Sequence, residues 1–241
     1  MNCIENLITR GLGRIKCDRF YSQFIKPGDL VYDIGANTGD KSKIFSRLVG
    51  MSGKVIAIEP QSSCIRELRN KFSKTKNIEL VQKAVGRTED ILDMHICNVN
   101  TLSSLSTDWI KSAQHHGRFR QEADWAQTEK VEVITLDSLI SEYGMPKFIK
   151  IDVEGYEKEV LLGLSMSIPC YLSIEFLPEL VEEARQCLEC LEKVGHILCN
   201  YSLDGSMELA LDGWVSADEV IRRIKDLEKG RDWGDIYIKL E

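Results

Sequence analysis

The chain has 241 residues, 43% of them hydrophobic and 29% charged, and its formal net charge is −7. A chain of this length and composition suits one soluble domain with a substantial core. Its acidic balance disfavours a nucleic-acid substrate, because negative charge repels phosphates. We find no apolar stretch near the roughly 20 residues of a membrane span and no secretory signal. We therefore predict a cytoplasmic protein with no membrane partner.

From residue 27 onward, the hydrophobic pattern alternates between strands and helices. Apolar runs predict strands at Leu30–Ile34 and Lys54–Ile58, and helical spacing predicts helices over 41–49 and 61–72. Helices are also expected near residues 156–164, over 178–194, and from a capping box at residue 216. Further strands are expected at Ile78–Val81, Ile91–Cys97, Glu129–Leu136, Phe148–Val153, Cys170–Phe176, His196–Ser202 and Asp235–Leu240.

These elements predict an α/β fold. Most of the main strands are apolar almost throughout, which is typical of strands covered on both faces. We therefore predict a three-layer αβα sandwich around a Rossmann-like, mostly parallel sheet of about seven strands, with an antiparallel last strand. Residues 1–26 are expected to form a helical cap, residues 27–241 the domain, and residues 98–128 a polar insertion within it. Ligands of such a fold bind at the carboxyl ends of the strands.

The segment between the first two strands carries the clearest functional signal. Asp33 is followed by a turn with Gly35 and Gly39, and Glu59-Pro60 follows the second strand. Glycines let the backbone approach a ligand closely, and an acid at the tip of the second strand can accept both ribose hydroxyls. We therefore predict a site for a nucleoside-bearing cofactor, with Glu59 on its ribose.

Charge and glycine spacing distinguish two cofactors. A dinucleotide site typically carries GxGxxG, which seats a pyrophosphate on a helix N-terminus. Here the glycines are Gly35 and Gly39, and Asp33 stands where a carboxylate would repel a pyrophosphate. S-adenosylmethionine has an ammonium and a sulfonium and no phosphate, so we predict it rather than NAD, with Asp33 near the methionine moiety. A nicotinamide-dependent oxidoreductase and a non-catalytic binding module remain the alternatives.

Other residues are expected to contact the same cofactor. The backbone from Gly35 to Gly39, including Ala36 and Asn37, is expected to pack against it. The segment after the third strand, with Gln82 and Ala84, lies where such folds usually touch the adenine. Gln82 could bond the edge of the base, although a polar residue that simply ends a strand fits equally well.

Several motifs together resemble the FkbM family of methyltransferases. They are Pro27-Gly28-Asp29, the segment from Asp33 to Gly39, Ile58-Glu59-Pro60, Ala84-Val85-Gly86, Ser103-Ser104-Leu105, Thr135-Leu136-Asp137 and Ile149-Lys-Ile-Asp152-Val-Glu154-Gly155-Tyr-Glu157. The resemblance covers residues 27–176, and Asp40 and Lys41 depart from the apolar residue that the family often has after the second glycine. It implies a class I methyltransferase domain that methylates a hydroxyl of a sugar, polyketide or similar metabolite.

Carboxylates at the strand tips are the candidate catalytic groups. A hydroxyl is a poor nucleophile, so a base should take its proton. Asp152 and Glu154 follow the strand at Phe148–Val153, and Glu175 lies at the end of the next. Alternation along an extended segment would point Asp152 and Glu154 the same way. We therefore keep two mechanisms: Asp152 or Glu154 as a direct base, or Mg²⁺ held by Asp152 and Glu175, with Glu154 as an optional third ligand.

The polar insertion contains a second candidate base. His115 and His116 lie there between Trp109 and Trp125. A mobile lid could bring His116 to the acceptor, and the tryptophans could stack on a sugar face. An exposed surface loop is the alternative interpretation. The expected partner is thus a small-molecule or glycan acceptor, and the oligomeric state does not follow from the sequence.

Overall fold

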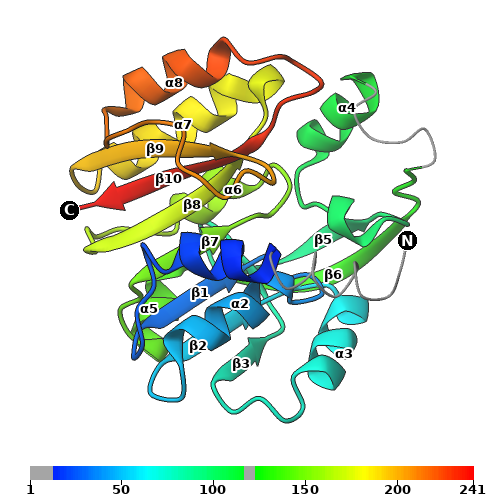
Figure 1. The fold of residues 1–241 in the computed structure, drawn as a ribbon. Coiled ribbons are helices and arrows are strands. Elements are labelled where there is room, and N and C mark those ends of the chain that lie inside the picture. Colours follow the sequence, from blue (N-terminus) through cyan, green and yellow to red (C-terminus); the bar gives the residue numbers. More distant parts are fainter. Residues whose placement is uncertain (1–12, 117–122) are drawn as a thin grey trace, which may run out of the picture.

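A seven-stranded sheet forms the centre of the computed structural model, which describes residues 13–116 and 123–241 (Figure 1). The strand order is β3-β2-β1-β7-β8-β10-β9, and only β10 runs antiparallel to its neighbours. The strands are β1 (Leu30–Ile34), β2 (Lys54–Ile58), β3 (Ile78–Val81), β7 (Phe148–Ile151), β8 (Cys170–Phe176), β9 (Ile197–Leu203) and β10 (Gly234–Leu240). The predicted mostly parallel sheet with an antiparallel last strand is confirmed.

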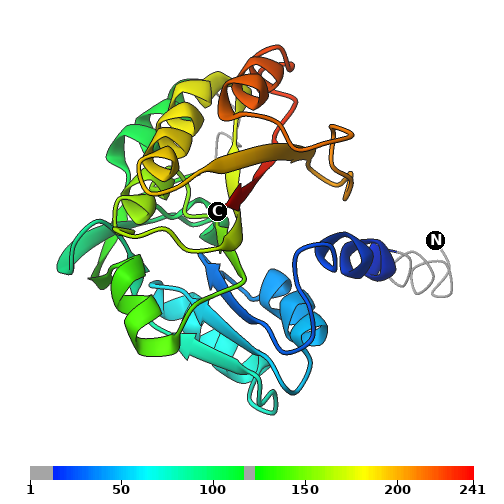
Figure 2. The same cartoon turned by 90° about the vertical axis from the view of Figure 1, so that its left-hand side faces the viewer.

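Helices cover both faces of this sheet (Figure 2). One face lies under a helix over residues 13–21, α2 (Asp40–Val49) and α3 (Ser62–Lys71). The other face lies under α5 (Leu136–Tyr143), α6 (Glu157–Leu161), α7 (Val181–Glu192) and α8 (Ala217–Lys225), with the short η2 (Pro178–Leu180) before α7. Apolar residues from both helical layers meet the apolar strands, so the predicted three-layer αβα sandwich is confirmed.

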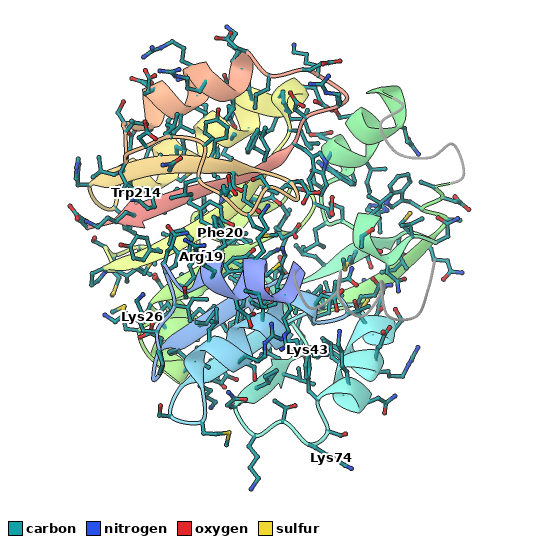
Figure 3. The ribbon with its side chains drawn as sticks, viewed as in Figure 1. Arg19, Phe20, Lys26, Lys43, Lys74 and Trp214 are labelled. Carbon is teal, nitrogen blue, oxygen red and sulfur yellow. The ribbon has the colours of Figure 1, made fainter. Side chains whose placement is uncertain are left out.

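Aromatic side chains fix the first helix to the sheet. Phe20 meets Tyr237 of β10 edge to face, with ring centroids 5.2 Å apart, and Phe24 stacks on the same ring at 4.9 Å. Trp214, from the loop after β9, also packs against this cluster and meets Phe24 edge to face (Figure 3). Aromatic pairs of this kind stabilise a fold beyond their buried area. The predicted cap of residues 1–26 extends into residues 1–12, which lie outside the described part, so its boundary stays a prediction.

A second, small sheet has the order β4-β6-β5 and stands beside the carboxyl ends of the main strands. Its strands are β4 (Ala84–Val85), β5 (Asp90–Ile96) and β6 (Gln127–Ile134). The predicted insertion at 98–128 contains η1 (Asn100–Leu102) and α4 (Thr107–His116), which enclose a small core of Cys97, Leu102, Trp109 and Ile110. The described part of the insertion is therefore folded onto the domain.

Two helices were missed in the sequence: α4 in the polar insertion, and α5 after β6. Residues up to Leu136 were expected to continue a strand, but β6 ends at Ile134 and α5 begins at Leu136. Thr135 caps that helix, because its side-chain oxygen accepts a hydrogen bond from the backbone N–H of Ser138 at 3.0 Å. This arrangement satisfies one of the unpaired N–H groups at a helix start.

No described helix combines the length and the apolar composition that crossing a lipid bilayer would need.

Candidate functional site

A cavity opens at the carboxyl ends of β1, β2 and β4, with about 700 Å³ of empty space when the open solvent at its mouth is included. Its polar wall contains Glu59, Asn37, Asp152 and Glu154, which come from β2, the turn after β1 and the loop after β7. Its apolar wall is formed by Ile34, Ile58, Val85, Met94 and Leu105. The cavity is therefore mostly apolar with a few convergent carboxylates, as ligand sites in such folds are.

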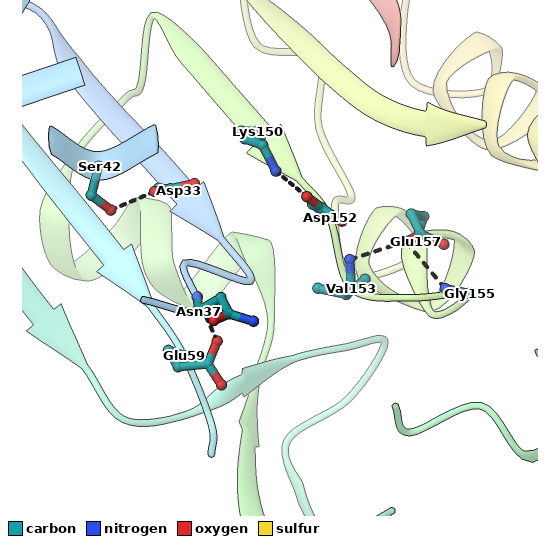
Figure 4. Close-up of polar contacts among 9 residues, drawn as sticks. All are labelled: Asp33, Asn37, Ser42, Glu59, Lys150, Asp152, Val153, Gly155 and Glu157. Atoms are coloured by element: carbon teal, nitrogen blue, oxygen red, sulfur yellow. Dashed lines mark hydrogen bonds and ion pairs between the residues drawn. The ribbon is translucent and has the colours of Figure 1, made fainter. Parts of the chain in front are cut away.

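Glu59 is fixed by backbone donors from both sides. Its two carboxylate oxygens accept hydrogen bonds from the N–H of Asn37 at 2.8 Å and of Gln61 at 2.9 Å (Figure 4 shows the first). The residue is only 5% exposed, and this burial raises the pKa of its carboxyl to about 7, with the two backbone donors opposing the rise. The side chain is thus held rigidly, and each oxygen retains a lone pair for a hydroxyl.

Close packing explains why the turn after β1 needs glycine. Gly35 has a φ of +80°, and a Cβ there would lie 1.8 Å from the carbonyl oxygen of Asp152. Asn37 also has a positive φ, of 47°, and it presents the N–H that Glu59 accepts. Because asparagine tolerates this conformation better than most residues, the turn can aim its N–H at the acid.

Three of the predicted cofactor residues lie behind the cavity instead of lining it. The carboxylate of Asp33 is buried beneath α2, where it accepts a hydrogen bond from Ser42 and leaves its other oxygen, Oδ1, without a partner (Figure 4). Burial raises the pKa of Asp33, which nearby Lys150 opposes. Ala36 packs in a small core with α3, and Gly39 begins α2 against Leu68.

The three predicted catalytic carboxylates meet at the end of β7 and β8. Asp152, Glu154 and Glu175 each place one oxygen within 4.8 Å of the others, and we name them the acid cluster. Asp152 accepts a hydrogen bond of 2.5 Å from Lys150, which is only 3% exposed (Figure 4). Burial raises the pKa of Glu154 and Glu175 well above the usual range, and the neighbouring acids add to the effect. The cluster therefore carries more acid than its neighbouring lysine can balance.

The loop that carries Glu154 is held in an unusual conformation. Glu154 has a positive φ of 53°, which costs free energy for a residue other than glycine. The buried carboxylate of Glu157 accepts the N–H groups of Val153 at 3.0 Å and Gly155 at 3.3 Å (Figure 4). Ser104 donates to the carbonyl oxygen of Glu154 at 2.6 Å. These bonds join the loop after β7 to the insertion and position Glu154 at the cavity.

The remaining predicted residues divide between the cavity and the surface. Pro60 and Ala84 line the cavity. Gln82 does not, because its exposed side chain bonds Ser62 at 3.0 Å and accepts from Arg69 at 3.2 Å. His116 is the last residue of α4, and its side chain lies outside the described residues.

Sequence reasoning did not name several residues of the cavity wall. Ser103 and Leu105 lie in it, although Ser103-Ser104-Leu105 had been noted only as part of the family resemblance. Tyr156 and Met94 also line it. The serine motif was the signal that could have placed the insertion beside the cofactor loop.

Comparisons with known proteins assign this site to a family. Residues 33–198 match the family model described as the methyltransferase FkbM domain. The match begins at Asp33 and runs past the acid cluster, so it includes all the cavity residues named above. It supports S-adenosylmethionine, and not a nicotinamide dinucleotide, as the cofactor.

Individual relatives are more distant. A presumed ribosomal RNA methyltransferase of Schizosaccharomyces pombe is 28% identical over 141 residues, which are 56% of this chain and 42% of that protein. The ubiquinone/menaquinone biosynthesis C-methyltransferase UbiE of Hahella chejuensis is 43% identical over 83 residues, one third of each chain (33%). The chain thus spans less than half the length of these curated relatives.

Among solved structures, a presumed rRNA methylase from Clostridium thermocellum aligns over 94% of this chain and 94% of its own, at 12% identity and a TM-score of 0.47. The assignment therefore depends on the family model. Because that model matches more than half of the sequence, this chain belongs to the FkbM methyltransferase family.

Proposed function

We propose that this chain transfers the methyl group of S-adenosylmethionine to a hydroxyl group of a small polyhydroxylated metabolite, such as a sugar or a polyketide. The observation that supports this most is that Glu59, Asp152 and Glu154 line one cavity.

The residues of the cavity fit the donor. Glu59 has a lone pair on each oxygen for the two ribose hydroxyls, and the apolar wall with Val85 and Met94 suits an adenine. Asp152 supplies negative charge for the ammonium and the sulfonium, beside the carboxyl of Glu154. The same carboxylates disfavour the pyrophosphate of a dinucleotide, which is why an oxidoreductase is the weaker interpretation.

When bound, the donor supplies a methyl group on sulfur, which bonds to the acceptor oxygen while the electrons of the carbon–sulfur bond return to sulfur. The protein must align the two partners and accept the proton that the hydroxyl loses. Glu154 suits the second task, because its strongly raised pKa makes it a better base than an ordinary carboxylate. Asp152 is engaged by Lys150 and suits the binding of positive charge.

A metal-assisted form of the reaction is the second mechanism. The three oxygens of the acid cluster lie close enough to one another to hold Mg²⁺, and carboxylates are the ligands that this ion prefers. A bound Mg²⁺ would lower the pKa of an acceptor hydroxyl. Full turnover in the presence of EDTA would exclude this mechanism. Turnover that EDTA abolishes and added Mg²⁺ restores would instead exclude Glu154 as the only group that activates the hydroxyl.

Calorimetric titration tests the cofactor, and product formation tests the reaction. We expect the purified chain to bind S-adenosylhomocysteine and not NAD, and Glu59→Gln to weaken that binding. We expect Glu154→Gln to bind S-adenosylhomocysteine as the unchanged chain does but to lose most turnover on hydroxylated acceptors. Binding of NAD alone would end the proposal, and unchanged turnover in Glu154→Gln would remove Glu154 as the base.

Ribosomal RNA is the competing acceptor, because the Schizosaccharomyces pombe protein carries that name. The net charge of −7 and the carboxylates of the cavity both oppose a phosphate backbone. We therefore expect no retention of ribosomal RNA in a filter-binding assay at 150 mM salt. Retention that falls steeply with salt would favour an RNA acceptor instead.

A further inference from the structure

A second cavity, of about 660 Å³, lies on the other side of the loop after β7. Its walls come from α4, the end of β8, η2 and α7. Trp109 of α4 and Gly155 of the loop both line it, and the Trp109 side chain packs so closely on Gly155 that a Cβ at this glycine would lie 2.4 Å from it. The second cavity is therefore built by the insertion and by helices of the main domain together.

The acid cluster lies between the two cavities. Asp152 and Glu154 line the first cavity, whereas Glu175 lines the second. Since oxygens of these three side chains lie within 4.8 Å of one another, a group bound at Glu175 reaches the carboxylates that face the first cavity. A hydroxyl bound at Glu175 would therefore lie near the two carboxylates that face the place where the methyl group would be delivered.

The charge of the second cavity is one-sided. Four carboxylates line it, and the described lining contains no lysine, arginine or histidine. Those carboxylates belong to Asp108, Glu157, Glu175 and Glu183. Asp108 pairs at 3.2 Å with Lys111, which does not line the cavity, and Glu157 bonds the loop. Burial raises the pKa of Glu175, so its ionised form is favoured only beside a positive charge.

We propose that the second cavity is the acceptor site and that its acceptor carries an ammonium group beside the hydroxyl that is methylated, as an amino sugar does. This inference rests on the methyl transfer proposed above and adds the substrate class. The ammonium would lie between Glu175 and Glu183, and the apolar residues Phe176, Leu177 and Leu180 would cover the carbon skeleton. An aromatic wall such as Trp109 is also favourable for a cation.

The same charges decide which atom of the acceptor reacts. An ammonium that is paired with carboxylates stays protonated and has no lone pair, so it cannot attack the methyl carbon. The hydroxyl retains its lone pairs and loses its proton to the acid cluster, which leaves a methyl ether on the acceptor. The site therefore favours oxygen over nitrogen even in a molecule that contains both.

Binding of three matched probes tests the inference. Calorimetry with the full chain, saturated with S-adenosylhomocysteine, compares glucosamine with glucose and glucuronic acid at pH 6.5. We expect glucosamine to bind about tenfold more tightly than glucose and glucuronic acid to bind least. Glu183→Gln should reduce the preference for glucosamine about threefold, because an exposed charge pair contributes little. Glu189→Gln, on the same helix but outside the cavity, should leave the preference unchanged.

Equal affinities for the three probes would overturn the inference, as would a failure of glucosamine to bind. A preference that Glu183→Gln does not reduce would overturn the placement of the ammonium in this cavity. Binding of S-adenosylhomocysteine is measured first and separately. If it fails, the proposed function fails; if it succeeds while the probes are not distinguished, only the acceptor class is wrong.

Discussion

Replacing Lys150 by methionine should destabilise the fold strongly, because this lysine is the buried counter-ion of several acids. It is 3% exposed and bonds Asp152 at 2.5 Å. Burial opposes its charge, but Asp152, then Asp33 and Asp235, outweigh that effect and raise its pKa. Asp33 is fully buried and pairs directly with Lys150 in the register of β1 and β7.

Methionine keeps most of the volume of lysine and removes only the charge. Removing one partner of a buried ion pair costs about 3–5 kcal/mol, because the other partner stays buried and unbalanced. We expect a loss in that range for Lys150→Met at pH 7, measured by urea denaturation of the full chain. The exposed Lys147, one residue before β7, provides the control, and Lys147→Met should change the free energy of unfolding by less than about 0.5 kcal/mol.

The loss of stability in Lys150→Met should also depend on pH, in a direction that the structure determines. Burial already raises the pKa of Asp33, and without Lys150 that pKa rises further. A raised acid pKa means that stability returns as the pH falls and the carboxyl takes up a proton. The difference between the variant and the unchanged chain should therefore shrink from pH 7 towards pH 5. A loss under about 1 kcal/mol, or one that grows on acidification, would refute this account of Lys150.

Three further predictions concern the loops of the site. Burial raises the pKa of Glu59 to about 7, so affinity for S-adenosylhomocysteine should fall as the pH drops through 7; Glu59→Gln should weaken binding about 10- to 100-fold and remove the pH dependence in calorimetry. Glu157→Ala should cost about 2 kcal/mol in urea unfolding, since two N–H groups lose a charged acceptor; under 0.5 kcal/mol would contradict this. Gly35→Ala should cost about 3 kcal/mol or more, because its Cβ would overlap the carbonyl of Asp152; Gly205→Ala, with positive φ but open space, should cost about 1 kcal/mol, and equal losses would exclude the overlap.

Local patterns in the sequence were sufficient to predict the fold and the position of some of the cofactor residues. The apolar runs at β1, β2, β7 and β8 predicted buried parallel strands. No helical pattern in these four segments competed with that interpretation. Gly35 and Glu59 were predicted to lie at the cofactor because a turn and a strand tip are local features. Both line the first cavity.

Residues whose position depends on packing were harder to predict. Asp33 follows the strand pattern, yet its side chain points beneath α2 toward Ser42, which no pattern within β1 indicates. Gln82 follows β3, but its side chain turns to Ser62, a residue of α3. The choice between two directions at a strand end is made by neighbours that are distant in sequence.

The acid cluster was predicted for an incomplete reason. Alternation along a strand was expected to point Asp152 and Glu154 the same way, but β7 ends at Ile151 and Glu154 has a positive φ. Their oxygens still meet because Glu157 and Ser104 hold the loop between them. Glu157 lies on α6 and Ser104 in the insertion, so the geometry of the cluster and the existence of the second cavity required the tertiary structure.

The excess of acid at the site also predicts how two substitutions combine. If Lys150→Met is destabilising because it leaves Asp33 charged and buried, then Asp33→Asn should recover part of the loss, since asparagine keeps the bond with Ser42 without a charge. The double variant should be about 2 kcal/mol more stable than additivity of the single changes predicts. Asp93→Asn, at an exposed acid of β5, should show no such coupling with Lys150→Met. Additive losses in both pairs would mean that Lys150 acts by packing alone, and that Asp33 is already neutral in the folded chain.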